Sequence, residues 1–406
     1  MKILVLNCGS SSVKFQLFEI EHEEILAKGV VERIGSDEAA VRYKLRGRGK
    51  EDQVRKIKDH DVAISLVLGI LMDPENGVIK DKSEIGGIGH RIVHGGQEFS
   101  SSTLITPEVK ESVQACVTLA PLHIPSNMKG IEVAEKLLPG VPQVAVFDTA
   151  FYQSLPPEAY TYALPYSLCQ KHQIRRYGFH GTSHNYVSRK AAKYMDQPVE
   201  KLKMITCHLG NGSSITAIDG GRAVETSMGF TPLEGLVMGT RCGDIDPAII
   251  TFLALEEDMN MMQIDSLLNK KSGMLGLTEK TNDFREIESE AENGDERCIL
   301  ALDIFCHRIK KYIGSYIAVL GGLDGLVFTA GIGENSHLVR SKVTSGLHNL
   351  GISLNPVMNV ANAFDIGTGS VKVLVVPTNE ELAIARDTRQ ILASLEHKTE
   401  KAISTV

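Results

Sequence analysis

Short apolar runs alternate along the chain with segments in which apolar residues recur every three or four positions. The first pattern predicts buried strands, and the second predicts helices. In the first half the expected strands are Ile3–Leu6, Val13–Ile20, Gly87–Val93 and Gln143–Phe147, and the expected helices are Val62–Met72, Glu111–Leu119 and Asn127–Leu138. In the second half the expected strands are Met204–Cys207, Ser214–Ile218, Leu326–Thr329 and Val371–Val376, and the expected helices are Pro247–Glu257, Met261–Lys270, Asp295–Leu320 and a closing helix to about Leu395. This alternation predicts an α/β fold.

One short pattern occurs twice. A shift of 201 positions places the strand Ile3–Leu6 on Met204–Cys207 and the turn Asn7–Ser12 on His208–Ser213, with a glycine and a serine in register. An offset of about half the chain indicates two related halves. Each half would present a strand, a glycine-containing turn and a second strand to a shared cleft.

Composition restricts the class of protein. A chain of 406 residues is long enough for two or three domains. Hydrophobic residues make up 43% and charged residues 23%, which is ordinary for a globular protein with a core. The net charge of −7, without long runs of Lys and Arg, argues against nucleic acid as a partner.

Cysteine usage and the absence of long apolar runs suggest a compartment. The seven cysteines are scattered and include no C-x-x-C pair, which favours free thiols in a reducing cytosol over disulfides or a zinc site. The N-terminal apolar run is too short for a signal peptide. Val62–Met72 has the length of a buried helix, not of a membrane span. We therefore expect a soluble, cytoplasmic protein without a membrane partner.

The first candidate for chemistry is the turn Asn7–Lys14, called here the first Gly/Ser turn. Its glycine allows close approach of the backbone to an oxyanion, and its serines, Ser12 among them, can donate to phosphate oxygens. Lys14 adds a positive charge on the face of the following strand that also carries Ser12. Asn7 offers an oxygen to a Mg²⁺-bound water. The alternative is an ordinary hairpin turn.

The second Gly/Ser turn, His208–Ser214, has the same character, and Asn-Gly within it is also a hairpin signal. Neither turn is a P-loop, so a Walker-type ATPase is disfavoured. A third segment, Gly331–Ser336, follows a strand and opens a helix, which suits a ribose or an α-phosphate. It lacks the third glycine of a dinucleotide fingerprint, so a nicotinamide dehydrogenase is disfavoured.

Further residues could act on an acceptor. Arg91 and Asp148 each end a buried strand, His180 lies in a segment rich in Arg and His, and Arg241 lies between glycines. A guanidinium suits carboxylate and phosphate equally well, whereas the alternative for each arginine is a structural salt bridge. Glu380 is either a Mg²⁺ ligand through water or an ordinary acid in the first turn of a helix.

The histidines offer a metal-binding alternative. His90 and His94, like His180 and His184, are four residues apart. There is no H-E-x-x-H motif, and on a strand this spacing does not bring side chains together, so histidine metal ligands are disfavoured.

Taken together, these segments resemble the acetate kinase family from residue 3 to about residue 387. The resemblance rests on Asn7–Lys14, His90–Gly96, Phe147–Ala150, Arg176–His184, His208–Ser213, Glu225–Asp244, Gly331–Ser336 and Pro377–Glu381. The stretch Glu225–Gly235 is a signature in itself.

The resemblance implies a duplicated α/β fold of the ribonuclease H-like, actin-like ATPase type, with an interdomain nucleotide cleft. It places an N-terminal domain at residues 1–148 plus 382–406 and a C-terminal, nucleotide-binding domain at residues 149–381. It also implies reversible transfer between ATP and acetate, giving acetyl phosphate and ADP, with Mg²⁺ (or Mn²⁺ in its place) and a homodimer.

The resemblance also assigns roles by position. Asn7 and Glu380 would serve the magnesium, and Arg91, Asp148, His180 and Arg241 would surround the transferred phosphoryl group. The residues expected to hold the phosphates are Ser12, Lys14, His208, Leu209, Gly210, Asn211 and Gly212. Those expected to hold the adenosine are Asp283, Phe284, Arg285, Gly331, Ile332, Gly333, Glu334 and Asn335.

The acceptor side is expected to be small and apolar. Val93, Leu122, Phe179 and Pro232 neighbour the motifs and would line it. Two departures from the family pattern lie on this side: Ile124, where the family usually has Asn, and Tyr152, where it usually has His. Propionate kinase is therefore the nearest alternative. A non-metabolic ATPase of the actin or heat-shock type is the alternative from another class.

Overall fold

The computed structural model describes residues 1–121 and 123–404, with side chains described up to residue 395. The chain forms two compact units, Met1–Gln153 with Asn379–Val406, and Ser154–Thr378. The resemblance to the acetate kinase family implied domain boundaries after residues 148 and 381, a few residues from the limits of these units. Within the described residues, no helix is both long and apolar enough to cross a membrane.

The first unit is built on an eight-stranded sheet with the order β5-β4-β3-β2-β1-β6-β8-β7. Its strands are β1 Lys2–Gly9, β2 Ser12–Glu19, β3 Glu24–Glu32, β4 Ala39–Leu45, β5 Lys50–Arg55, β6 Ile85–Ile92, β7 Thr103–Leu104 and β8 Gln143–Phe147. Its helices are α1 His60–Leu71, α2 Pro107–Ala115, α3 Ile124–Leu137 and α15 Glu380–Ser404, with short 3₁₀ helices at Lys82–Glu84, Cys116–Thr118 and Ala150–Ser154. The expected helices of this half are thus present with shifted ends.

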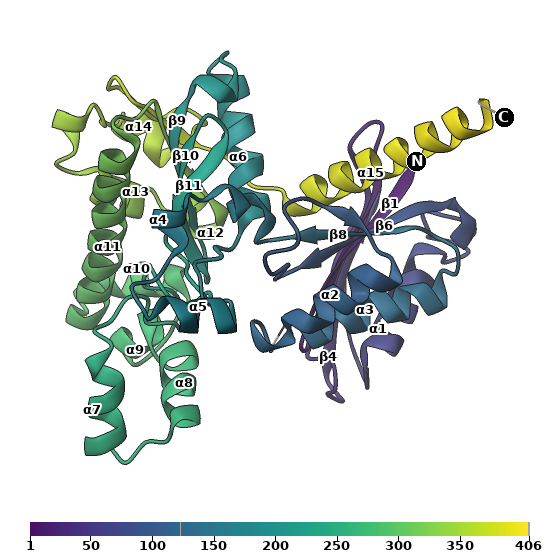
Figure 1. The fold of residues 1–406 in the computed structure, drawn as a ribbon, viewed down its shortest axis with the longest axis horizontal. Helices are drawn as coiled ribbons and strands as arrows, with labels where there is room; N and C mark the ends of the chain where they lie inside the picture. Colours follow the sequence, from purple (N-terminus) through teal and green to yellow (C-terminus); the bar gives the residue numbers. More distant parts are fainter. Residues whose placement is uncertain (122, 405–406) are drawn as a thin grey trace. The chain divides into compact units, whose positions relative to one another are not determined.

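Helices cover both faces of this sheet (Figure 1). α1 and α3 pack on the apolar residues of β1 and β2, with Leu4 and Leu6 fully buried between them. α15 packs on β6, where Gly87 and Gly89 leave room for it. A Cβ atom on either glycine would lie 2.5 Å from Leu392 or Ile384 of α15. The glycines of β6 therefore fix the position of α15 and of Glu380 at its start.

The second unit repeats the central strand pattern in a five-stranded sheet of order β11-β10-β9-β12-β13. Its strands are β9 Lys203–Leu209, β10 Ser213–Asp219, β11 Arg222–Thr226, β12 Gly325–Thr329 and β13 Lys372–Val375. Its helices are α4 Pro157–Tyr160, α5 Tyr166–His172, α6 Gly181–Tyr194, α7 Ala248–Glu256, α8 Met261–Lys270, α9 Gly273–Thr278, α10 Phe284–Glu292, α11 Glu296–Leu320, α12 Ala330–Asn335, α13 His337–Thr344 and α14 Pro356–Val360, with short 3₁₀ helices at Val199–Lys201 and His348–Leu350.

α6 and α11 pack against this sheet (Figure 1). Alternate residues of β9, such as Ile205 and Cys207, enter the core with α11. The residues between them, Thr206 and His208, contact α6 instead. The period of two in a strand thus puts the apolar residues on one face and the polar ones on the other.

The strands show the repeat that the offset of 201 predicts. β1 pairs antiparallel with β2 and parallel with β6, and β9 pairs in the same way with β10 and β12. The turns differ by one residue. In the first hairpin Gly9 pairs with Ser12, which leaves two turn residues, whereas in the second Leu209 pairs with Ser213, which leaves three.

Candidate active site

The first Gly/Ser turn joins β1 to β2. Asn7 lies directly opposite Lys14 in the pairing of these strands. Asn127 of α3 fixes the end of β1, since its side-chain amide donates to the carbonyl of Cys8 over 2.9 Å and its oxygen accepts from the amide of Val93 over 3.1 Å. Lys14 itself is exposed. The turn is therefore anchored to the neighbouring strand while its lysine stays available.

Arg91 and Asp148 form a two-pronged ion pair in the first unit. Nε and Nη2 of Arg91 donate to the two carboxylate oxygens of Asp148 over 3.0 and 2.6 Å. The Asp148 side chain is only 2% exposed. The carboxylate of Glu380 lies 3.8 Å from Nε of Arg91. Burial opposes the charge of Arg91, but the carboxylates of Asp148 and Glu380 outweigh it and raise the pKa of Arg91.

The sheet explains why these two residues meet. β6 and β8 are parallel neighbours, and Ile92 lies opposite Phe147 in their register. Arg91 lies at the end of β6, and Asp148 follows β8 directly, with its amide donating to the carbonyl of Ile92 over 3.0 Å. Parallel strands bring their carboxyl ends to one sheet edge. Asp148 thereby orients the Arg91 guanidinium.

In the second unit a chain of neutral groups leads to His180. Nδ1 of His180 lies 2.9 Å from the hydroxyl of Ser214, and the same hydroxyl lies 2.7 Å from Nε2 of His184. Nδ1 of His184 lies 2.6 Å from the hydroxyl of Thr206. Burial, and secondarily His208, hold the pKa of His184 well below its usual value. The imidazole of His184 is therefore neutral.

His180 is held in a strained backbone conformation at the start of α6, with φ of +59°. Its ring stacks on His208 with 4.3 Å between ring centres. His208 is in turn bonded through Nδ1 to Ser183 of α6 over 2.8 Å. Stacking and hydrogen bonding together leave His180 one orientation.

Arg241 has a different environment from Arg91. Its Nη1 donates to the carbonyl of Pro232 over 3.1 Å, and none of the described carboxylates forms an ion pair with it. Burial lowers the pKa of Arg241. A Cβ atom placed on Gly212 would lie 3.4 Å from the His180 ring and 3.6 Å from Nη1 of Arg241. The second Gly/Ser turn therefore passes beside a desolvated guanidinium and an oriented imidazole, which suits an anionic ligand.

A cavity of about 630 Å³ adjoins the second Gly/Ser turn. It brings together three segments that the resemblance assigned to the nucleotide, and its lining includes Gly210, Asn211, Asp283, Phe284, Arg285, Gly331, Ile332 and Asn335. Two lining residues are joined to each other, since Nδ2 of Asn282 donates to Oδ1 of Asn211 over 3.1 Å. Apolar walls with a few polar groups suit a nucleoside.

Residues 2–386 of the chain match the model of the acetokinase family. The chain belongs to the acetokinase family. It is therefore an enzyme, a kinase of a family that uses ATP. The solved structures described below confirm the predicted fold class.

Relatives in this family match over nearly the full length. The chain is 54% identical over 396 residues to the acetate kinase of Desulfitobacterium hafniense (strain DSM 10664 / DCB-2), covering 97% of this chain and 99% of the relative. It is 52% identical over 408 residues to the acetate kinase of Methanosarcina acetivorans, covering 100% of both.

Two solved structures superpose closely. The acetate kinase of Porphyromonas gingivalis gives a TM-score of 0.93 at 47% identity, covering 96% of this chain and 99% of that one. The propionate kinase of Francisella tularensis subsp. tularensis SCHU S4 gives 0.91 at 43% identity with the same coverage.

Not every residue expected to bind ATP faces this cavity. Leu209 is fully buried in the core of the second sheet. Gly333 packs on the strands, where a Cβ atom would lie 3.5 Å from the carbonyl of Cys207. Glu334 accepts the amides of Ala330 and Thr378 over 2.9 and 3.1 Å. In this acetokinase these three residues shape the backbone around the cavity.

The residues expected to line the acceptor pocket are divided between the units. Val93 lies in the first unit and is half-buried, whereas Phe179 and Pro232 lie in the second. Leu122 lies outside the described residues. The disfavoured metal-binding histidines have other bonds: His90 lies 2.6 Å from the side-chain oxygen of Gln143 and has a pKa lowered to about 4 by burial.

The signature Glu225–Gly235 is held by a residue that the sequence had singled out only as one of several arginines. Arg176 donates to the carbonyl of Thr226 over 3.0 Å and to the carboxylate of Glu234 over 2.8 Å. The hydroxyl of Tyr162 donates to the same carboxylate and accepts from the amide of Phe230. Ser214 and Thr206 were likewise missed as partners, because the polar rows of β9 and β10 that carry them are recognised only once these strands are paired.

Proposed function

We propose that this acetokinase transfers the γ-phosphoryl group of ATP to acetate, giving acetyl phosphate and ADP, and that it also catalyses the reverse reaction. The observation that carries this proposal is the desolvated Arg241 guanidinium beside His180 and the second Gly/Ser turn. The names of the full-length relatives agree with it. An actin-like ATPase would hydrolyse ATP without acetate, so acetate-dependent formation of ADP is the first test.

The chemistry requires no general base. A carboxylic acid with a pKa near those of Asp and Glu is ionised at neutral pH, so acetate attacks directly in line with the leaving ADP. The barrier lies in bringing two anions together and in the charge that spreads over the moving phosphoryl group. Arg91, Arg241 and His180 answer this need by preorganised electrostatics, with Asp148 as the positioning residue for Arg91.

Magnesium fits the residues assigned to it. Asn7 and Glu380 offer an amide and a carboxylate oxygen, and Mg²⁺ is commonly held by one or two carboxylates together with substrate phosphates. Such an ion needs no cluster of protein ligands, and among the described residues no group of three or more His, Cys, Asp or Glu suits a metal. When bound, Mg²⁺ supplies charge neutralisation of the phosphates. Activity should therefore vanish with a chelator and return with Mg²⁺, or with Mn²⁺ in its place.

The remaining roles are proposed as the resemblance to the family assigns them, and the cavity beside the second Gly/Ser turn supports the assignment of the adenosine. Ser12, Lys14 and the second Gly/Ser turn are proposed to hold the phosphates. The cavity lined by Asp283–Arg285, Gly331, Ile332 and Asn335 is proposed to hold the adenosine. Val93, Leu122, Phe179 and Pro232 are proposed around the acetate methyl group. A trapped nucleotide analogue should crosslink to Phe284 or Ile332, and crosslinks confined to the first sheet would contradict this assignment.

Arg241→Ala tests the central role. Turnover should fall by about 10²–10³-fold, the usual effect of removing a group that stabilises transition-state charge. Nucleotide binding should survive because the adenosine cavity is unchanged. Arg241→Lys is the matched control, which keeps the charge but loses the planar fork. Near-normal turnover of Arg241→Ala would eliminate this role.

Propionate is the second candidate acceptor, because a propionate kinase superposes on the chain with a TM-score of 0.91. One methylene in an apolar pocket changes binding by only about 1–3 kcal/mol. We expect kcat/KM to fall from acetate to propionate to butyrate. A higher kcat/KM for propionate would reassign the substrate.

We further propose that the enzyme is a homodimer in the cytoplasm. α7 has the sequence AIITFLALE but buries none of its residues, and Phe252 and Leu255 are 61% and 75% exposed. An exposed apolar surface of this kind marks a contact with another protein chain. All seven cysteines are free, as a reducing compartment requires. Phe252→Glu with Leu255→Glu should convert a dimer to a monomer in analytical ultracentrifugation.

A further inference from the structure

One face of the antiparallel part of the first sheet carries five cationic side chains. They are Lys14 of β2, Lys28 of β3, Arg42 and Lys44 of β4, and Lys50 of β5, and they line a hollow of about 620 Å³. Four strands contribute to this group, called here the cationic hollow. Among the described residues, one acid contributes to its lining, Glu381 at the start of α15.

The strand register places three of these lysines directly opposite one another. Lys28 pairs with Lys44, and Lys44 pairs with Lys50. Neighbouring strands are about 4.8 Å apart, so the three side chains leave the sheet close together on one face. Like charges directly opposite each other on a sheet destabilise it. The arrangement therefore works against folding.

No ion pair among the described side chains offsets this repulsion. Lys14, Lys28, Lys44 and Lys50 form no ion pair with any of them, although lysines elsewhere in the chain do. The chain as a whole is acidic, with a net charge of −7. A general excess of lysine thus does not explain the hollow. Local conflicts of this kind in a folded protein mark functional positions.

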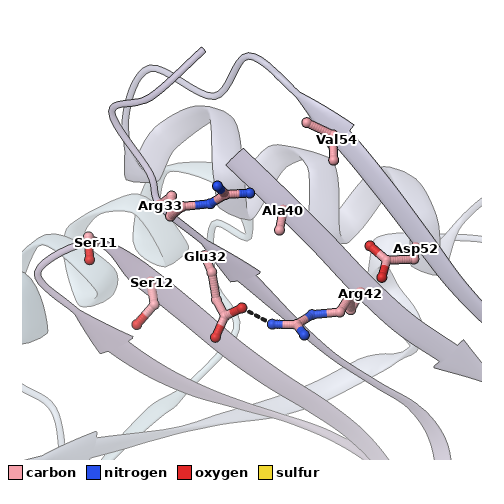
Figure 2. Close-up of a pocket in the computed structure, with 8 residues that line it drawn as sticks. All are labelled: Ser11, Ser12, Glu32, Arg33, Ala40, Arg42, Asp52 and Val54. Carbon is pink, nitrogen blue, oxygen red and sulfur yellow. Dashed lines mark hydrogen bonds and ion pairs between the residues drawn. The ribbon is translucent and has the colours of Figure 1, made fainter. Parts of the chain in front are cut away.

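The adjacent hollow on the same sheet shows what a balanced surface is like (Figure 2). There Arg33 and Arg42 lie with Glu32 and Asp52, and the Arg42 guanidinium is paired with Glu32. Arg42 also borders the cationic hollow, but its charge is already answered by Glu32. The positive charges without an ion-pair partner among the described side chains are therefore those of the four lysines.

We propose that the cationic hollow is a second anion site, which binds a polyphosphate group. An anion with several clustered charges answers several lysines at once, which a single carboxylate or phosphate does not. Stacking on a base has no support here, since Phe15 is in the core and Tyr43 packs against that core. The cationic hollow shares only Lys14 with the first Gly/Ser turn, which is proposed to hold the ATP phosphates. The anion site therefore goes beyond the proposed function.

Inorganic tripolyphosphate is the probe. Calorimetric titration into the protein saturated with Mg²⁺-ADP should give one binding event per chain, weakened by salt. Lys28→Gln/Lys44→Gln/Lys50→Gln should weaken it roughly tenfold, the sum of three exposed ion pairs. The matched control, Lys171→Gln/Lys193→Gln/Lys270→Gln, removes the same charge from exposed lysines of the second unit and should bind like wild type. Equal affinity in the two triple variants, or no binding to wild type at low salt, overturns the proposal.

Two further measurements complete the test. Equilibrium dialysis with ATP tells whether the polyphosphate group belongs to a nucleotide or is free. Binding of two ATP per chain indicates a nucleotide, whereas binding of one ATP per chain indicates a free polyphosphate. The first triple variant should melt at a higher temperature than wild type at low salt, with the gap closing as salt screens the repulsion. A lower melting temperature at low salt would contradict the repulsion argument. Kinase activity should be near normal in this variant, because the three lysines lie outside the proposed catalytic residues. If wild type shows no acetate-dependent kinase activity, the proposed function is refuted, but the anion site is not.

Discussion

The two units share a strand pattern, yet they place opposite kinds of polar cluster beside their Gly/Ser turns. In the first, Arg91 is neutralised in advance by Asp148 and lies close to Glu380. In the second, Arg241 has no carboxylate partner among the described residues, and His180 ends a chain of neutral groups. The repeated strands therefore supply positions, and the side chains at those positions supply distinct electrostatics. The first cluster holds a cation rigidly, and the second leaves one unpaired for an anionic ligand.

The largest effect is expected from Arg91→Ala. It leaves the Asp148 carboxylate buried without its partner, and breaking a buried ion pair in this way costs about 3–5 kcal/mol of stability. Turnover should also fall by roughly 10³-fold or more, since both an orienting charge and the local structure are lost. Urea unfolding and a coupled kinase assay measure the two effects.

A double variant separates them. Arg91→Ala with Asp148→Asn removes the stranded charge, so most of the stability should return while turnover stays low. In the second unit Arg241→Ala should cost little stability, because no carboxylate is stranded there. Equal destabilisation by the two arginine variants would remove the distinction between the clusters.

The next largest effect should appear when the pH is lowered, because two buried histidines of the first unit must then become charged. Burial lowers the pKa of both His90 and His94 from 6.5 to about 4. Their neutral forms therefore contribute stability that is complete above pH 6.5 and is lost as the pH falls toward 4. At about 1.4 kcal/mol per pKa unit this is about 3 kcal/mol for each residue. The urea midpoint of wild type should fall over this range, and His90→Gln should flatten the slope; an unchanged slope would contradict the assignment.

The strands that carry this comparison were predicted only in part. Apolar runs disclosed β1, β6, β8, β9 and β12, because these strands are buried on both faces. β5, Lys50–Arg55, has every residue exposed and so no apolar pattern to detect. β3 and β4 were missed with it. The offset of 201 predicted the repeat correctly, but not the extra residue in the second turn, which depends on the register of paired strands.

The candidate site was likewise predicted only in part from the sequence. Arg91 and Asp148 could be picked out as residues at strand ends, but their pairing requires the sheet order β6-β8, which no local pattern encodes. Asp283–Arg285 entered only through the resemblance to the acetate kinase family. The hydroxyls of Thr206 and Ser214 that hold the histidines lie on facing polar rows of β9 and β10, which are recognised only once the strands are paired.

Within the neutral cluster, His180 and His184 should differ. His180→Ala removes the imidazole beside Gly212 and should lower kcat about 100-fold, with KM for ATP little changed. His184→Gln keeps a hydrogen-bonding group near Ser214 and should lower kcat only about tenfold, by loosening His180. The controls are the melting temperatures of both variants. A larger kcat loss for His184→Gln, at equal stability, would assign the direct role to His184.

The smallest effects should come from the two turn glycines, and they compare the turns directly. A methyl group on Gly212 would lie 3.4 Å from the His180 ring and 3.6 Å from Arg241, which is ordinary contact. The backbone of Gly212 lies outside the left-handed region, so alanine fits without strain. Gly212→Ala should therefore fold with an unchanged melting temperature. It should still lower kcat/KM for ATP roughly tenfold, because the methyl group occupies space where phosphate oxygens must approach backbone amides.

In the first turn, a methyl group on Gly9 would lie 2.9 Å from the hydroxyl of Ser12, which can rotate away. Gly9→Ala should thus reduce kcat/KM only a few-fold, through loss of the Ser12 contact with phosphate. Steady-state kinetics at matched Mg²⁺, with the melting temperature of each variant as control, decide the order. If Gly9→Ala is the more damaging at equal stability, the phosphates bind more closely to the two-residue turn. The longer second turn would then serve to position His180 and Arg241, not to cradle the nucleotide.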